Sequence, residues 1–402
     1  MQDFLILRDK SAGQRSRSHV PGTEYESAFP RAGTSAFPAD LPPQPAVHTE
    51  KLRPQDVKEM IRDPSVADLA PVMPTKLISP FASEAEAAAQ SAWGLEAVHA
   101  ETSPFSGQDV TVAVLDTGID ENHDAFAGIN LVTKDFSGSG DHDNNGHGTH
   151  CAGTILGRDV NGTRIGIARG VTKALAGKVL ADDGGGDSRM IFEGIQWALD
   201  SGAKVISMSL GFDFPGYVKR LVDGGWPADL ATSHALEAYR ANLRMFDALM
   251  SMVRARSAFD GGAVIIAAAG NESRRDLDPD YEIGASVPAV AQGVISVGAL
   301  KNGDDGLSIA YFSNTFPRIS APGVDILSAR TGGGLAIMSG TSMACPHVAG
   351  LAALWWEAAR ALGLPATADN VTARLLASAD ITALAPGLDI ADRGVGLARA
   401  PA

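Results

Sequence analysis

The stretch Gly340–Gly350 reads Gly-Thr-Ser-Met-Ala-Cys-Pro-His-Val-Ala-Gly and runs into a predicted helix, Met343–Leu362, whose apolar residues recur with helical spacing. Pro346 fits the first turn of that helix, where a missing backbone N–H breaks no hydrogen bond. Ser342 therefore lies at a helix N-terminus, where free N–H groups and the helix dipole stabilise negative charge. A serine in this position is most often an N-cap, but its hydroxyl is also placed to attack a carbonyl carbon.

Two upstream motifs carry the groups that a serine nucleophile needs. Asp116 ends a continuous apolar run, Val110–Leu115, and is followed by Thr-Gly. His147 lies in Asn-Gly-His-Gly-Thr-His-Cys-Ala-Gly. Taken in the order Asp…His…Ser, the three motifs resemble those of the subtilisin-like serine peptidases, the subtilase family. The resemblance extends from about residue 91 to about residue 395.

The resemblance assigns a role to each of these residues. Ser342 attacks the carbonyl carbon, and neutral His147 takes the hydroxyl proton and returns it to the leaving amine. Asp116 accepts a hydrogen bond from the other ring nitrogen and so holds the imidazole in the required tautomer. Asn271, in Ala-Ala-Ala-Gly-Asn-Glu, and the backbone N–H of Ser342 are expected to stabilise the oxyanion.

Three further segments resemble the walls of the subtilase substrate cleft. They are Gly184, Gly185 and Gly186; Ser209, Leu210 and Gly211; and Ala268, Ala269 and Gly270. Glycines in the first segment are expected to let a substrate strand approach closely, and the small residues predict a pocket for larger apolar side chains. None of the three segments contains an acidic residue that would indicate a preference for basic substrates.

The order of elements indicates an α/β fold with a mostly parallel, doubly wound sheet and helices on both faces. The predicted strands and helices alternate along the chain: Val110–Leu115, Ala174–Leu180, Ser188–Ser201, Val205–Leu210, Gly262–Ala269 and Gly293–Val297. Such sheets place functional residues at the carboxyl ends of their strands. Residues 212–261 interrupt the pattern and are predicted to form a helical insertion. It either packs on the core or forms a wall of the substrate groove.

Residues 1–90 form an N-terminal extension that differs from the catalytic domain expected over 91–402. Its predicted strand, helix and strand are Phe4–Arg8, Arg53–Arg62 and Ser65–Met73. Ser11–His48 is predicted to be loop, and Ser83–Gln90 a linker or a helix. The extension resembles a reduced inhibitory propeptide, which implies autoprocessing between about Pro74 and Ser91. The alternative is an extension with no inhibitory role.

Charge and hydropathy narrow the expected partners. The formal charge of −14 over 402 residues argues against nucleic acid, which binds basic surfaces. No apolar run approaches the ~20 residues that cross a bilayer, and the N-terminus has no secretory h-region. We expect protein or peptide substrates, no membrane partner and a cytoplasmic location, with export by another route left open. The sequence does not indicate an oligomeric state.

The chemistry requires no cofactor, and a structural calcium ion is the one metal that the resemblance raises. The position aligned with a calcium-binding carboxylate of many subtilisins is Ala125, next to Asp124, so that site is doubtful. Asp159 and Asn161 offer hard oxygen ligands of the kind that calcium takes, so the metal site stays undetermined. The two cysteines, Cys151 and Cys345, are predicted to be buried, inert thiols.

Other peptidase and esterase classes fit the motifs poorly. An aspartic peptidase needs a second aspartate motif, and Asp116 lies in the only Asp-Thr-Gly. An α/β-hydrolase needs Gly-x-Ser-x-Gly and the order Ser…Asp…His. His147-Gly-Thr-His lacks the glutamate of the zinc motif. The sequence therefore predicts a serine endopeptidase of broad specificity with a preference for apolar side chains. A catalytically silent, peptide-binding pseudopeptidase is the alternative.

Overall fold

The computed structural model describes residues 1–12, 42–82 and 92–402. An eight-stranded sheet forms its centre, in the order β14-β13-β12-β10-β6-β8-β7, with β15 pairing to β13. All pairs are parallel except β13–β14. The strands are β6 (Thr111–Asp116), β7 (Asn130–Asp135), β8 (Lys173–Lys178), β10 (Val205–Met208), β12 (Val264–Ala268), β13 (Ile295–Lys301), β14 (Ser308–Ile309) and β15 (Ile319–Pro322). The predicted fold class is confirmed.

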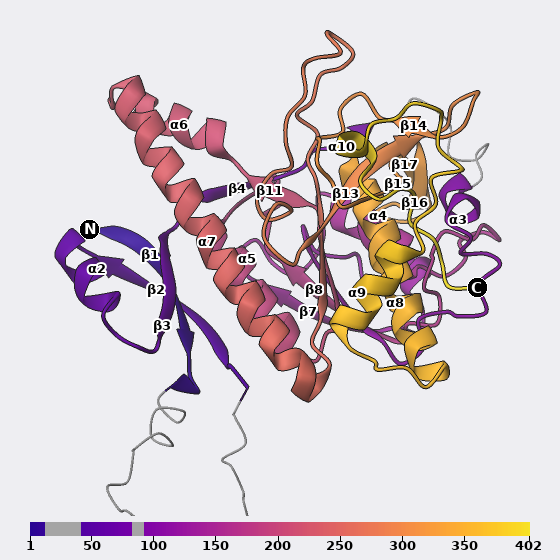
Figure 1. Ribbon diagram of the computed structural model, residues 1–402, viewed down its shortest axis with the longest axis horizontal. Coiled ribbons are helices and arrows are strands. Elements are labelled where there is room, and N and C mark those ends of the chain that lie inside the picture. The colour runs from indigo at the N-terminus through magenta and orange to yellow at the C-terminus, as the bar shows by residue number, and fades with distance from the viewer. Residues whose placement is uncertain (13–41, 83–91) are drawn as a thin grey trace, which may run out of the picture.

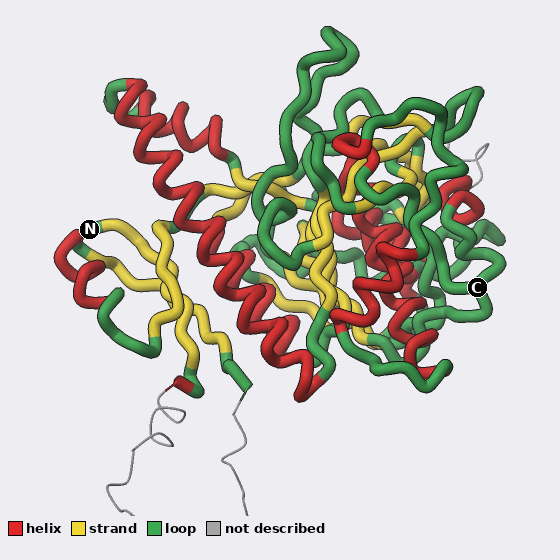
Figure 2. Tube along the Cα trace, viewed as in Figure 1, coloured by secondary structure: helices red, strands yellow, loops and turns green. Residues whose placement is uncertain are grey.

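Helices cover both faces of this sheet (Figures 1 and 2). One face carries α4 (His147–Leu156), α8 (Thr341–Ala361) and α9 (Ala368–Ala377), and the other α5 (Ser188–Asp200) and α7 (Ala228–Asp260). Alternate residues of a strand point to opposite faces. Val112 and Val114 of β6 accordingly pack into the core under α4 and α8, whereas Ala113 and Leu115 pack into the core under α5 and α7.

Residues 212–261 contain α6 (Phe214–Asp223) and the 33-residue α7. Phe246 and Leu249 of α7 are fully buried in the second core, so this helix packs on the central sheet. Its other side contacts β3 of the N-terminal sheet. Figure 1 shows α7 running between the two sheets. The insertion therefore packs on the core of the central domain and also contacts the N-terminal sheet.

The N-terminal sheet is antiparallel, in the order β2-β1-β3, with bounds β1 (Gln2–Asp9), β2 (Pro45–Leu52) and β3 (Val66–Pro71); α2 (Pro54–Met60) packs on it. The predicted strand, helix and strand are confirmed. The prediction of loop over Ser11–His48 is wrong for Pro45–His48, which pair with β1 from Asp9 to Ile6. Strand β2 is short and mostly polar, so its sequence shows no regular alternation of apolar and polar residues. Its extended structure depends on its pairing with β1. Residues 13–41 and the predicted linker Ser83–Gln90 lie outside the described residues.

Between the two sheets the chain crosses the carboxyl ends of the central strands. Strand β4 (Pro74–Leu77) lies between β9 (Gly185–Asp187) and β11 (Leu210–Phe212), and β5 (Phe81–Ala82) pairs with β17 (Leu335–Ser339), which pairs with β16 (Ile326–Ala329). The prediction of one strand over Val205–Leu210 is wrong at its end. The chain leaves the central sheet after Met208, and Leu210 pairs with β4 instead.

The remaining helices of the described residues are short: α3 (Trp93–Ala97), the 3-10 helix η2 (Asp124–Phe126) and α10 (Ile390–Arg393). Among the helices described, none combines the length and the apolar character needed to cross a bilayer.

Candidate active site

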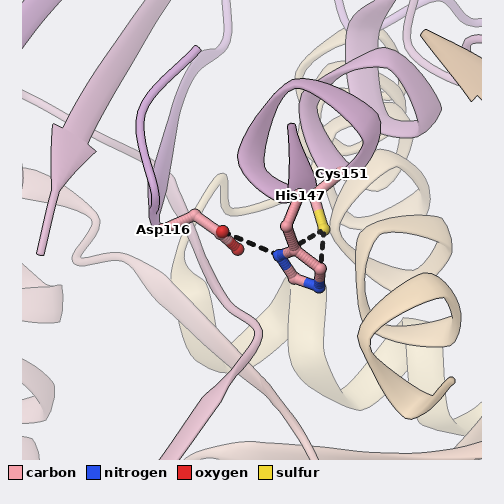
Figure 3. A group of neighbouring side chains, drawn as sticks. All are labelled: Asp116, His147 and Cys151. Carbon is pink, nitrogen blue, oxygen red and sulfur yellow. Dashed lines mark hydrogen bonds and ion pairs between the residues drawn. The ribbon is translucent and has the colours of Figure 1, made fainter. Parts of the chain in front are cut away.

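Asp116 and His147 meet where the central sheet and α4 are closest. Asp116 is the last residue of β6, and His147 is the first of α4. Their Oδ1 and Nδ1 atoms lie 2.7 Å apart, and both side chains are buried (Figure 3). A side chain at Gly148 would be 2.1 Å from the Gly118 carbonyl oxygen, so glycine is required for this approach. The arrangement leaves Nε2 of the imidazole as the free, reactive nitrogen if Nδ1 carries the proton.

A buried carboxylate that the sequence analysis did not single out holds these two elements together. Asp143 Oδ1 accepts hydrogen bonds from Thr117 Oγ1 and Gly146 N, both at 2.8 Å. Its Oδ2 accepts from Thr149 N at 2.9 Å and from Thr149 Oγ1 at 2.6 Å. A carboxylate at a helix N-terminus is also favoured by the helix dipole. Asp143 thus ties the turn after Asp116 to the start of α4.

Lys178 is a second buried group that sequence reasoning missed. Its Nζ donates to the Thr117 carbonyl oxygen at 2.7 Å, to the His142 carbonyl oxygen at 3.0 Å and to Asp182 Oδ1 at 2.6 Å. The sequence signal was a lysine at the end of an apolar strand, where a charged residue needs partners to be buried. Lys178 fixes the same Asp116-Thr117 turn from the side of β8.

Ser342 lies in the first turn of α8 and is fully buried. Its Oγ donates a 2.7 Å hydrogen bond to the carbonyl oxygen of Ile78. Within the described part of the chain, the Ser342 hydroxyl makes no other hydrogen bond. In particular, no hydrogen bond joins it to His147. The thiol of Cys151 contacts both residues, with Sγ 4.0 Å from His147 Nε2 and 3.4 Å from the backbone carbonyl oxygen of Ser342 (Figure 3 shows its contact with the imidazole).

Asn271 points its amide nitrogen toward the same N-terminal segment that Ser342 contacts. Its Oδ1 accepts from Thr341 N at 2.9 Å and from Thr341 Oγ1 at 2.8 Å. Its Nδ2 is therefore left to donate, and it donates to the Ser79 carbonyl oxygen at 3.1 Å. Thr341, the residue before Ser342, was not singled out from the sequence as the group that orients Asn271.

The predicted substrate-binding segments border strand β4. Thr75 pairs with Gly186, Lys76 with Gly185 and Gly211, and Leu77 with Leu210. The Leu77 N–H also donates to the Gly184 carbonyl oxygen at 2.8 Å. Strand β4 thus receives backbone pairing on both edges.

The glycines allow this close pairing. A Cβ at Gly186 would lie 2.9 Å from Thr75 Oγ1, and one at Gly184 would lie 3.1 Å from Leu77 Cβ. Both positions would have to shift to accept a side chain.

The remaining predicted residues surround the nucleophile. Ser209 Oγ donates to the Ser342 carbonyl oxygen at 3.1 Å. Ala268 and Ala269 are fully buried at the end of β12, and the Gly270 N–H donates to Thr341 Oγ1 at 3.1 Å. The structure therefore brings the predicted site residues together around Ser342 and residues 75–79, but among the described residues no hydrogen bond joins His147 to Ser342.

The thiols and the neighbouring imidazoles are buried. Burial raises the pKa of the Cys151 thiol well above its ordinary value and that of Cys345 to about 11, so both are thiols in neutral solution, as predicted. Burial also lowers the pKa of His150 to about 3 and that of His347 to about 4. Both imidazoles are therefore neutral in the folded protein at neutral pH.

In the described residues, one group of three metal-binding side chains comes together: Asp116, His147 and Cys151 (Figure 3). A cation there would occupy the imidazole that the proposed chemistry needs. Asp159, a candidate calcium ligand, accepts a hydrogen bond from Arg169 Nη1 at 2.7 Å.

The site combines a buried carboxylate–imidazole pair with a serine in the first turn of a helix, on a parallel α/β sheet, and these are the groups that a serine hydrolase uses. The subtilase family model matches residues 107–397, and the chain belongs to that family. The predicted family is thereby confirmed.

Named proteases are similar to much of the chain. Subtilisin-like protease 6 of Trichophyton verrucosum is 35% identical over 264 residues, 62% of this chain and 52% of that protein. A thermostable alkaline protease of Halalkalibacterium halodurans is 32% identical over 362 residues, 87% of this chain and 84% of that protein. A cuticle-degrading serine protease of Arthrobotrys oligospora is 34% identical over 305 residues, 70% and 63% of the two chains. The chain spans about half the length of the first of these relatives.

Proposed function

We propose that this protein is a serine endopeptidase in which Ser342 is the nucleophile, His147 the general base and Asp116 the group that orients His147. The observation that carries the proposal is the course of residues 74–79. They lie in the cleft as an extended peptide, paired on both edges, with a carbonyl 2.7 Å from the Ser342 hydroxyl. Strand addition of this kind is how a cleft holds a peptide by its backbone, whatever its sequence.

The chemistry follows from the contacts. His147 removes the Ser342 proton as Oγ forms a bond to the carbonyl carbon, and the carbonyl oxygen becomes an oxyanion. Asn271 Nδ2 and the Ser342 N–H stabilise that charge. His147 then gives the proton to the amine as the C–N bond breaks. Water attacks the acyl-enzyme by the same route and releases the carboxylate product.

Residues 74–79 also indicate the substrate preference. Ile78 is buried, and a Cβ at Gly211 would lie 3.8 Å from its Cγ1. Leu77 is also buried, packed in the core that includes Leu180. We therefore propose cleavage after apolar residues, with the backbone pairing giving a broad tolerance elsewhere.

The same segment is the first substrate that we propose. The contact of the Ser342 hydroxyl with the Ile78 carbonyl supports cleavage at the Ile78–Ser79 bond, which lies within the range Pro74–Ser91 expected from the sequence. In the structure the Ser342 hydroxyl meets the oxygen of Ile78 and Asn271 holds the oxygen of Ser79. Cleavage requires the Ile78 carbonyl to turn so that its carbon faces Oγ and its oxygen faces Asn271. This arrangement is therefore a resting one, in which the segment fills the cleft.

No metal enters these steps. We propose that chelators leave the chemistry unchanged, because each proposed step uses only side chains and backbone groups of the chain. Incubation with EDTA followed by a peptidase assay tests this. A loss of turnover that calcium restores, at a temperature where the protein stays folded, would overturn it.

A fluorophosphonate probe separates the proposed enzyme from a silent peptide-binding protein. The probe should label the wild-type chain at Ser342 and leave Ser342→Ala unlabelled, because only an activated serine reacts. Because residues 74–79 occupy the cleft, labelling is followed over hours alongside the length of the chain. Absence of labelling in a chain that has lost its N-terminal segment would favour the pseudopeptidase.

A further inference from the structure

Strand β4 turns alternate side chains to opposite sides. Thr75 and Leu77 are buried against the catalytic domain, whereas Lys76 between them faces outward over the rim of the cleft. Residues on one strand alternate in this way because its side-chain period is two. Any peptide bound in this register therefore places its third residue before the scissile bond at the position of Lys76.

Two carboxylates from different loops converge on that position. Lys76 Nζ lies 3.6 Å from Asp213 Oδ1 and 3.9 Å from Glu272 Oε1. Asp213 directly follows β11, and Glu272 directly follows Asn271. We call Asp213 and Glu272 the rim pair.

Both carboxylates are fixed before any ligand arrives. Asp213 Oδ1 accepts from Gly216 N at 3.2 Å as the N-cap of α6. Glu272 Oε2 accepts from the buried Asn314 Nδ2 at 2.8 Å, which leaves Oε1 facing Lys76. When a lysine binds in this position, its own side chain therefore loses conformational freedom, whereas the two carboxylates lose little.

We propose that the rim pair is a specificity site that favours lysine or arginine three residues before the scissile bond. The inference rests on the proposed peptidase function and extends it. It also differs from what the three predicted substrate segments suggested, because both acids lie just outside those segments and come together only in the fold. All three side chains are partly exposed, so each ion pair is a modest one. Together they should give a preference of about 3- to 10-fold in kcat/KM at low salt.

The direct test uses three peptide anilides, acetyl-Pro-Thr-X-Leu-Ile-p-nitroanilide, with X as lysine, norleucine or glutamate. The wild-type chain should cleave the lysine peptide fastest and the glutamate peptide slowest. The lysine preference should shrink at high salt, since exposed charges are screened. In the double variant Asp213→Asn/Glu272→Gln the lysine-to-norleucine ratio should approach one. Both substitutions keep an acceptor for the Gly216 and Asn314 hydrogen bonds.

The control is Asp304→Asn, an exposed carboxylate in the turn between β13 and β14. It removes one negative charge from the surface and should leave the ratio at its wild-type value. Cleavage of all three peptides at equal rates would overturn the rim-pair proposal and leave the peptidase function standing.

A second measurement does not depend on turnover. In a Ser342→Ala background, hydrogen exchange of residues 75–79 is compared between Lys76→Met and Lys76→Glu. The glutamate faces the rim pair with like charge and should raise the exchange rate of these amides about 3- to 10-fold over the methionine variant. Equal rates would overturn the proposal, including in the case where no peptide is cleaved and the peptidase function itself fails.

Discussion

Asp116 and His147 are held by groups of the central domain, whereas the Ser342 hydroxyl and the Asn271 amide nitrogen donate to residues 78 and 79 of the N-terminal segment. The first pair, with Asp143, is the acid–base half of the site; the second pair, with Thr341, is the nucleophile half. Hydrogen bonds inside the fold fix the first half whether or not a peptide is present. The second half meets whatever lies in the cleft, and here that is the chain itself. The comparison teaches that the nucleophile half should respond to loss of the N-terminal segment and the acid–base half should not.

The nucleophile half is broken most directly at Asn271. Asn271→Ala removes the donor that Thr341 aims into the cleft, and turnover should fall about 10²–10³-fold, the magnitude known for a lost oxyanion donor in subtilisin itself. The Michaelis constant should change little, because the contact strengthens in the transition state. Steady-state kinetics on the isoleucine anilide decide it, with Asn130→Ala on β7 as an exposed control. Unchanged turnover would remove Asn271 from this role.

Each half also contains one buried neutral histidine, His150 in α4 and His347 in α8. Their folded pKa values of about 3 and about 4 lie below the ordinary value of about 6.5. The unfolded chain binds protons below about pH 6.5 and the folded chain does not, so stability is fully present above that pH. It is lost as the pH falls toward 4, by on the order of 3 kcal/mol for His347 alone.

The measurement is denaturant unfolding at pH 7.5 and pH 4.5 in a Ser342→Ala background, which prevents self-digestion. His347→Gln should be less stable than its parent at pH 7.5, because the substitution removes the imidazole and with it the 2.7 Å contact between Nδ1 and the Met343 carbonyl oxygen. The variant should lose less stability on acidification than its parent. An equal acid loss in both proteins would show that His347 does not contribute to it.

The N-terminal segment reaches the nucleophile half by way of α7, and Asn242 is the contact to test. Its Nδ2 donates to the Pro71 carbonyl oxygen at 2.8 Å, at the end of β3. Asn242→Ala removes this part-buried hydrogen bond, a change that costs about 0.5–1.5 kcal/mol. In the Ser342→Ala background, hydrogen exchange in residues 66–79 should rise while the central sheet stays protected. Thr232→Ala, an exposed position on the same helix, is the control; a uniform rise over the whole chain would contradict local anchoring.

The comparison also explains which parts of the fold and of the site could be predicted from the sequence. Asp116, His147 and Ser342 lie in long contiguous motifs at the ends of predicted elements, so their positions and the parallel sheet could be predicted. Asp143 could have been predicted from its position four residues before His147, but the sequence analysis did not use this spacing. Strand β4 and the rim pair have no local signal, because they depend on pairing between segments more than a hundred residues apart. Strand β2 was partly missed because its structure depends on pairing with β1, which residues 10–44 separate from it along the chain.

The central claim is that Ser342 cleaves the chain's own segment where it lies in the cleft. Intact-mass spectrometry of freshly purified protein, followed over hours, tests it most directly on wild type and Ser342→Ala in parallel. The account predicts that wild type loses its N-terminal segment to give a new N-terminus at Ser79, while Ser342→Ala keeps its full mass and remains folded. A wild type that cleaves peptides while staying intact from Met1, or a Ser342→Ala chain that is cut at the same bond, would contradict it.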